Sequence, residues 1–132
     1  MIQRYSSGSA FEQTFGYSRA VAIPNGDWLE ILVSGCSGFD YSTMTLPEGV
    51  EAQTRQAFAN VAAALAKAGA GLEHLVRVRI YLADGGDFDT IAPIVGDHCR
   101  AAMPANTSIV AKLLDPKMKI EIEVDARLPR KA

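Results

Sequence analysis

Close to the end of the chain lies a stretch, residues 119–125, in which apolar and charged side chains alternate strictly. Successive side chains of a β-strand point to opposite faces of a sheet, so this pattern predicts a strand with one side facing a core. The apolar side carries Ile120, Ile122 and Val124. The charged side carries Glu121, Glu123 and Asp125. Three carboxylates spaced about 7 Å apart form either a solvated face or one wall of a site.

The segment in front of this strand predicts a partner for it. Residues 107–114 are rich in strand formers, and Asp115-Pro116 is a turn signal. We therefore expect the two strands to pair as a terminal hairpin. Pro104 cannot continue a helix, so it separates this hairpin from the helix predicted before it.

The remaining elements follow from turn signals and from the spacing of apolar residues. Asn25-Gly26 predicts a first hairpin, and apolar residues three and four positions apart predict a helix that Gly69 ends. Residues 1–18 are expected to be an extended lead-in with aromatic anchors. The predicted elements are strands 19–23 and 28–33, helix 50–68, strand 74–82, helix 88–102 and the terminal hairpin.

This order of elements predicts the α+β class, with residues 1–132 as one domain and both helices on one face of a mixed sheet. Strand 28–33 is almost continuously apolar, which predicts burial on both faces. In strand 74–82, alternation places Val76 and Val78 on the core side. The other sheet face would be bare and polar, and a symmetric oligomer would bury it as paired charges. That face would carry Arg77, Arg79, Tyr81, Glu121 and Glu123.

Composition excludes several classes of function. The net charge of −2 comes with scattered lysines and arginines, which argues against nucleic acid as a partner. Cys36 and Cys99 fit reduced thiols in a cytoplasmic protein, and His74 and His98 lack metal-ligand spacing. Residues 1–8 contain no apolar run, and no segment approaches the ~20 apolar residues of a membrane span. We therefore expect no metal, no signal peptide and no membrane partner.

Several short motifs together resemble the YjgF/RidA family, whose members are also called reactive-intermediate deaminases or endoribonuclease L-PSP-like proteins. The resemblance runs from about Tyr17 to Arg127. The motifs are Ser34-Gly35, Glu51-Ala-Gln53-Thr-Arg55-Gln56-Ala57, Asn60-Val61, Ala68-Gly69, Val76-Arg-Val78, Tyr81-Leu82, Asp87-Phe88, Pro104-Ala105 and Lys119-Ile120-Glu121-Ile122-Glu123. The resemblance implies a chorismate-mutase-like α+β fold and a homotrimer. It also implies small-ligand clefts between subunits, in which catalytic members hydrolyse enamines and imines without metal or organic cofactor.

The same resemblance assigns candidate site residues. It implies that Tyr17 walls the cleft, that the backbone amide of Gly35 contacts the ligand, and that the Glu121 carboxylate positions or activates water. A backbone contact is implied near Ser108. A carboxylate in a half-enclosed cleft can relay a proton between water and an imine nitrogen, which gives Glu121 a chemical role.

The chain departs from the family pattern at the residue that binds the substrate carboxylate. Asn106 stands where the family has an arginine that holds the substrate carboxylate with two hydrogen bonds, and an amide cannot replace a guanidinium. Cys36 stands where glutamine is common and could face the cleft, although a buried thiol is favoured. Arg77 and Arg79 are expected to pair with carboxylates across a subunit contact, with supply of the missing cation as the alternative.

Two functions remain open on this basis. The first is a deaminase, a hydrolase of C–N bonds, that acts on an enamine or imine other than 2-aminoacrylate. The second is a non-catalytic trimeric module that binds a metabolite or a protein in the same cleft. A ribonuclease function lacks support, because the sequence offers neither a His/His/Lys-type acid–base set nor a basic groove.

Overall fold

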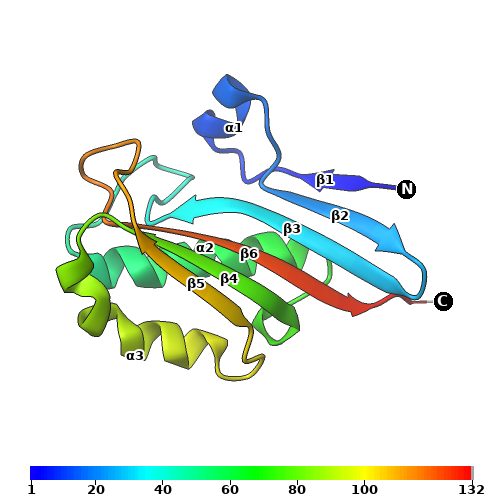
Figure 1. Cartoon of the computed structure of the whole chain (residues 1–132). Coiled ribbons are helices and arrows are strands. Elements are labelled where there is room, and N and C mark those ends of the chain that lie inside the picture. Colours follow the sequence, from blue (N-terminus) through cyan, green and yellow to red (C-terminus); the bar gives the residue numbers. More distant parts are fainter. Residues whose placement is uncertain (132) are drawn as a thin grey trace.

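The computed structural model describes residues 1–131, which form a twisted sheet backed by helices (Figure 1). The elements are β1 (Gln3–Tyr5), α1 (Ala10–Phe15), β2 (Ala20–Asn25), β3 (Trp28–Ser37), α2 (Val50–Lys67), η1 (Leu72–His74), β4 (Leu75–Leu82), η2 (Gly85–Asp87), α3 (Phe88–Cys99), β5 (Ala105–Val110) and β6 (Ile120–Pro129). The strand order is β1-β2-β3-β6-β4-β5. Only β4 and β5 pair in parallel among these neighbours.

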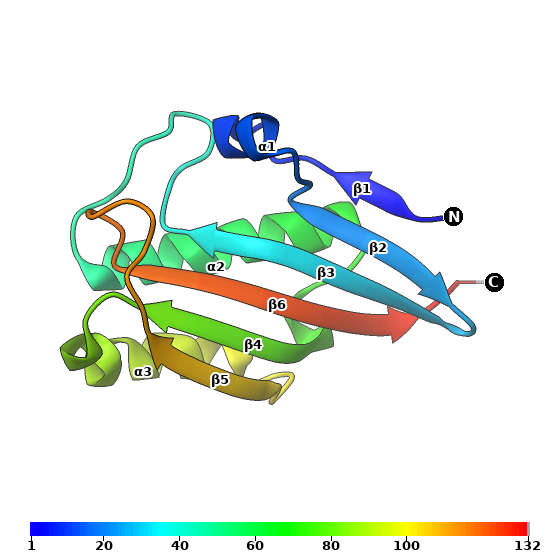
Figure 2. The ribbon, with the colours of Figure 1, turned by 45° about the horizontal axis from the view of Figure 1, so that its top comes forward.

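Both long helices cover one face of the sheet (Figure 2). Helix α2 packs on β3 and β6, and α3 packs beside α2. The apolar sides of β3, β4 and β6 meet the buried side of α2, where Phe58, Val61 and Leu65 are fully buried. The predicted mixed sheet with both helices on one face is therefore confirmed.

The predicted terminal hairpin is wrong. Strands β5 and β6 are not neighbours, because β4 lies between them and pairs with both. Helix α3 carries the chain from β4 to β5 as a crossover, so β5 becomes a parallel edge strand. The predicted turn at Asp115 does form, with Asp115 Oδ1 accepting from the Lys117 amide at 2.8 Å. It belongs to the loop that crosses from β5 to the centre of the sheet.

Glutamine 53 fixes that loop against α2. Its buried side chain donates to the carbonyl oxygens of Pro47 and Lys117, each at 3.0 Å, and accepts from the Lys119 amide at 2.8 Å. Residue 38 must be glycine for the same packing, because a Cβ there would lie 2.7 Å from the Gln53 Cα. The buried amide of Gln53 thus joins the loop before α2 to the loop that leads into β6.

Two β-bulges change which side chains face the core. The register shifts between Leu75 and Arg77, so Leu75 is buried while Val76 is 47% exposed, and the prediction that Val76 faces the core is wrong. Strand β3 is also not buried on both faces, since Leu32 is 46% exposed on the side away from the helices. The second of the two bulges lies in β3, between Val33 and Cys36.

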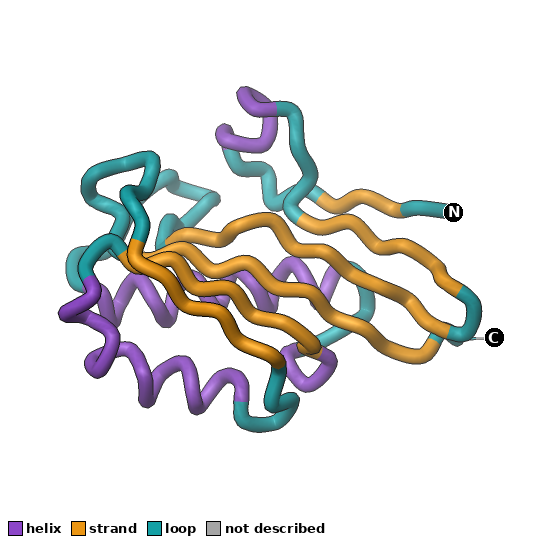
Figure 3. Tube along the Cα trace, viewed as in Figure 1, coloured by secondary structure: helices purple, strands orange, loops and turns teal. Residues whose placement is uncertain are grey.

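The N-terminal residues are more ordered than an extended lead-in. Strand β1 pairs with β2, and the short helix α1 stands above the sheet (Figure 3). Ser9 caps α1 by accepting from the Phe11 amide at 3.0 Å, and Gly16 ends it at φ 73°. The sequence carried this signal, because Ser9 and Glu12 have the spacing of a capping box.

The face opposite the helices carries the charged rows that the sequence predicts. Arg79 lies 3.8 Å from Glu123 and 3.6 Å from Asp125, and the Tyr81 hydroxyl donates to Glu123. Arg79 thus pairs within its own chain. Exposed apolar side chains, Leu32 and Ile109, lie among these charges. Within residues 1–131, no helix has the length and apolar character that crossing a membrane requires.

The bulge in β4 predicts different outcomes for two valines that are two positions apart. Val78→Ala removes fully buried methyl groups and should lower the free energy of unfolding by about 2 kcal/mol. Val76→Ala, the matched control, should change it by less than about 0.5 kcal/mol. Urea unfolding at one fixed protein concentration measures both. Equal losses would contradict the register described above.

Candidate functional site

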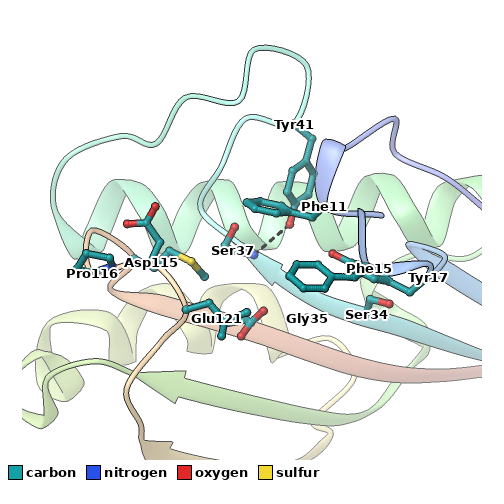
Figure 4. Close-up of a pocket in the computed structure, with 12 residues that line it drawn as sticks. Phe11, Phe15, Tyr17, Ser34, Gly35, Ser37, Tyr41, Asp115, Pro116 and Glu121 are labelled. Carbon is teal, nitrogen blue, oxygen red and sulfur yellow. Dashed lines mark hydrogen bonds between the residues drawn. The ribbon is translucent and has the colours of Figure 1, made fainter. Parts of the chain in front are cut away.

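A cavity of about 670 Å³ opens at the end of the sheet where β3 leaves and β6 begins. It lies between α1, the last residues of β3 and the loop before β6 (Figure 4). Its apolar lining is Phe11, Phe15, Tyr17, Tyr41, Leu114 and Met118. Its polar side chains are Ser34, Ser37, Asp115 and Glu121. The cavity therefore combines an aromatic wall with two carboxylates.

Glu121 points into this cavity from the polar side of β6 (Figure 4). Its side chain is half-buried. Burial raises the pKa of Glu121 above its ordinary value, the neighbouring Glu123 carboxylate raises it further, and the Arg19 charge partly offsets both. A carboxyl group with a raised pKa in a cavity can both accept and return a proton.

Gly35 lies directly against Glu121. A Cβ at residue 35 would come within 2.6 Å of Glu121 Oε1, so only glycine leaves the carboxylate its present place. The bulge in β3 creates this approach, because Ser34 and Gly35 together fill the interval between Val33 and Cys36. Residues from two neighbouring strands, Gly35 and Glu121, therefore meet at this cavity, and the roles toward a ligand that the resemblance implies for them stay predictions.

Tyr17 and Tyr41 wall the cavity from the segment after α1 and from the loop after β3. The Tyr17 amide donates to the Glu12 carbonyl oxygen at 3.2 Å, which fixes the backbone just after the helix. The Tyr41 hydroxyl accepts from the Ser37 amide at 3.2 Å. Burial raises the pKa of Tyr41 to about 12, so this phenol stays protonated.

Cys36 does not face the cavity, so its place among the candidate ligand-binding residues is corrected, and the buried thiol that the sequence favours is confirmed. Its side chain is 0% exposed and belongs to the main core. The bulge reverses the alternation, so Cys36 pairs with Ile122 and shares its buried side. Burial raises the pKa of the Cys36 thiol to about 11, which leaves it unreactive near neutral pH.

Asn106 and Ser108 lie elsewhere in the chain, on edge strand β5. The Ser108 hydroxyl donates to Asn106 Oδ1 at 2.8 Å, and neither residue lines the cavity. Strand β4 separates them from β6, and the register places Asn106 about 14 Å from Glu121 at ordinary strand spacings. A single chain thus unites Tyr17, Gly35 and Glu121 but leaves Asn106 and Ser108 outside.

Arg19 supports the cavity from below, and the sequence did not indicate this role. It is 2% exposed, donates to the Gly35 carbonyl oxygen at 2.8 Å, and lies with its guanidinium 4.2 Å from the Tyr41 ring centre. Its Nη2 lies 3.4 Å from Glu12 Oε2, a buried ion pair. Arg19 therefore supports the backbone of Gly35 and the ring of Tyr41 from behind. Its isolated position in a short strand offered no signal of burial.

Glu12 balances the Arg19 charge. Although burial alone would raise its pKa, hydrogen bonds from Ser7 and Ser6 and the Arg19 charge hold the pKa of Glu12 below its ordinary value. Within residues 1–131, the Nε and Nη2 atoms of Arg19 have no hydrogen-bond partner. The buried cation is thus compensated by Glu12 and by stacking on Tyr41.

Neither arginine of β4 lines the cavity, and Arg79 already contacts two carboxylates. Over the described chain, no group of three histidine, cysteine, aspartate or glutamate side chains could hold a metal ion.

Comparison with known proteins identifies a family for this chain. Residues 7–128 match the family model described as Endoribonuclease L-PSP. An uncharacterized protein of Streptomyces coelicolor is 30% identical over 126 residues, which cover 95% of this chain and 91% of the relative. A protein of Rattus norvegicus named 2-iminobutanoate/2-iminopropanoate deaminase is 33% identical over 128 residues, covering 96% and 90%.

A solved structure shares the whole fold. The crystal structure of a member of the YjgF/YER057c/UK114 family from Mycobacterium tuberculosis matches with a TM-score of 0.83 at 32% identity. The match covers 97% of this chain and 100% of that one.

The buried pair beneath the cavity predicts non-additive effects on stability. Arg19→Met leaves the Glu12 carboxylate buried without its compensating cation and should lower the free energy of unfolding by about 3–5 kcal/mol. Adding Glu12→Gln to Arg19→Met should recover part of that loss, because no unpaired charge remains. Urea unfolding of the two single variants and the double variant measures the coupling. Strictly additive losses would show that the two side chains do not stabilise each other.

Proposed function

The chain belongs to the endoribonuclease L-PSP family, also called YjgF/RidA, and from this premise we propose that it hydrolyses a small imine or enamine and releases ammonia. The deaminase name of the Rattus norvegicus relative supports this reaction class. Both free cysteines are buried, which fits the cytoplasmic location proposed with it.

The half-buried carboxyl of Glu121 is the observation that carries the proposal. Glu121 would accept a proton from water as the water oxygen bonds to the imine carbon. It would then return that proton to the nitrogen. As the C–N bond breaks, Glu121 would take the remaining hydroxyl proton and pass it to the departing ammonia, so that a carbonyl compound and ammonium leave. Overall, a protonated imine and one water give a carbonyl compound and ammonium.

A second copy of the chain would complete the site. We place the neighbour's Asn106 and Ser108 opposite Glu121 in a cleft between subunits of a homotrimer, with a small molecule as the ligand. Two features support this arrangement: one chain leaves Asn106 about 14 Å from Glu121, and β5 is an edge strand with exposed apolar residues.

A non-catalytic binding module is the second candidate, and Asn106 is the observation that favours it. An amide in place of the guanidinium is what a site adapted to binding alone would show. The same aromatic cavity and carboxylates would then hold a metabolite or a protein segment without turnover.

Replacing the carboxyl group of Glu121 tests the reaction. Glu121→Gln should abolish accelerated ammonia release from any imine that the protein hydrolyses, because the amide cannot relay a proton. Glu73→Gln, an exposed control far from the cavity, should retain the full rate. Light scattering should give the same homotrimer for all forms. Retained turnover in Glu121→Gln would remove Glu121 from the mechanism, and a monomeric protein would remove the intersubunit cleft.

The residue at position 106 predicts the substrate range. Asn106 cannot form two charge-assisted hydrogen bonds, each worth ~1.5–3 kcal/mol, so ammonia release from 2-iminopropionate should be absent or weak. Asn106→Arg should raise kcat/KM on that substrate about 100-fold or more. The matched control, Asn106→Lys, supplies charge without the planar fork and should gain much less. A wild-type rate equal to that of Asn106→Arg would contradict the role of residue 106.

A further inference from the structure

The geometry points to a ligand with an aromatic body and a positively charged nitrogen, and without a carboxylate, as the occupant of the cavity beside Glu121. Arylalkyl imines in their protonated form belong to this class. The part of the inference that concerns turnover rests on the function proposed above. The part that concerns binding stands on the lining of the cavity alone.

The first step is the aromatic wall. Phe11 and Phe15 lie one helical turn apart on α1 and both line the cavity, where Tyr17 and Tyr41 complete the wall (Figure 4). Phe11 is held in place by an edge-to-face contact with Phe39, at 5.5 Å between ring centres. This wall is therefore anchored on its inner side.

The outer part of the wall is exposed. Phe15 is 65% exposed at the rim, and Leu114 across the cavity is more exposed still. Large apolar side chains that converge on an open cavity gain free energy when an apolar ligand covers them. A cavity of about 670 Å³ also exceeds what a small aliphatic imino acid fills, so it has room for an aryl group.

The second step is the sign of the charge. Glu121 and Asp115 are the charged side chains that line the cavity in residues 1–131, and both are acidic. Arg19 lies behind the wall, almost completely buried and paired with Glu12, so it offers an anion no exposed donor. Lys117 follows Pro116 in the rim but does not line the cavity. Within one chain, a ligand carboxylate would therefore face like charges without a cation to hold it.

The third step joins charge and aromatic rings. Aromatic faces attract cations, and a carboxylate beside them adds an ionic contact. The chain already shows this preference, because the Arg19 guanidinium stacks on the buried side of the Tyr41 ring. A protonated imine nitrogen near Glu121, with its aryl group against Phe15 and Tyr17, would satisfy both parts of the lining.

A matched pair of probes tests the inference by calorimetric titration near neutral pH. 2-Phenylethylammonium and 3-phenylpropanoate are similar in shape and opposite in charge. The ammonium should bind about tenfold more tightly or better than the carboxylate, and about tenfold more tightly than propylammonium, which lacks the ring. Equal or tighter binding of 3-phenylpropanoate would overturn the inference about charge, and equal binding of propylammonium would overturn the inference about the ring.

Variants assign the binding to this cavity. Phe15→Ala should weaken 2-phenylethylammonium binding several-fold, whereas Phe88→Ala, an exposed phenylalanine on α3, should leave it unchanged. Glu121→Gln should weaken it about tenfold, with Glu73→Gln as the unaffected control. Unchanged binding in both cavity variants would overturn the inference. So would a Phe15→Ala variant that changes the assembly state by light scattering, because Phe15 would then be an interface residue.

Turnover is measured apart from binding. An amine oxidase converts 2-phenylethylamine to its imine with O₂ as oxidant, and catalase removes the peroxide; ammonia release above the spontaneous rate is then recorded. Tight 2-phenylethylammonium binding without accelerated ammonia release would overturn the proposed hydrolysis and leave the ligand class standing. Accelerated ammonia release from 2-iminopropionate without 2-phenylethylammonium binding would overturn the ligand class and leave the proposed hydrolysis standing.

Discussion

The structure depends on the central place of β6, which pairs with β3 on one edge and with β4 on the other. Its apolar side supplies four fully or almost fully buried residues to the core under α2, and these are Ile120, Ile122, Val124 and Ala126. A strand paired on both edges cannot slip by one residue without moving this set to the opposite face. The same constraint fixes Glu121 on the other face at the start of the strand. Burial of the core thus positions the candidate catalytic carboxyl.

Around Glu121, backbone irregularity brings the site together. The bulge in β3 lets Gly35 approach the carboxylate while Cys36 turns into the core. Arg19 supports this arrangement from beneath by holding the Gly35 carbonyl oxygen and stacking on Tyr41. Because a buried cation needs compensation, Glu12 is drawn in from α1, which also carries Phe11 and Phe15. The ion pair therefore links the lower part of the site to its aromatic wall.

The charges around the cavity connect fold and chemistry. Glu121 and Asp115 supply negative charge to a largely aromatic lining. Within residues 1–131 no lysine or arginine lines the cavity, because Arg19 lies behind the wall and Arg79 contacts carboxylates elsewhere. Such a site can relay a proton through Glu121, but it lacks the means to hold a ligand carboxylate. The family supplies the reaction class, while the local residues argue for a different substrate. The two proposals are compatible because Glu121 lies on β6 and Asn106 lies on β5.

The sequence by itself determined the α+β class, the helix α2 with its end at Gly69, and the polar and apolar sides of β6, since these follow from local periodicity. The resemblance to the family also assigned Glu121 and Gly35 to one cleft. Only the tertiary structure decided that β4 separates β5 from β6, because strand pairing depends on crossovers and not on local pattern. The bulges were likewise invisible, so Val76 was assigned to the wrong side, and the sequence left Cys36 as a candidate ligand contact beside the favoured buried thiol. The burial of Arg19 depends on Glu12, Gly35 and Tyr41 meeting in space, and no sequence spacing records such a meeting.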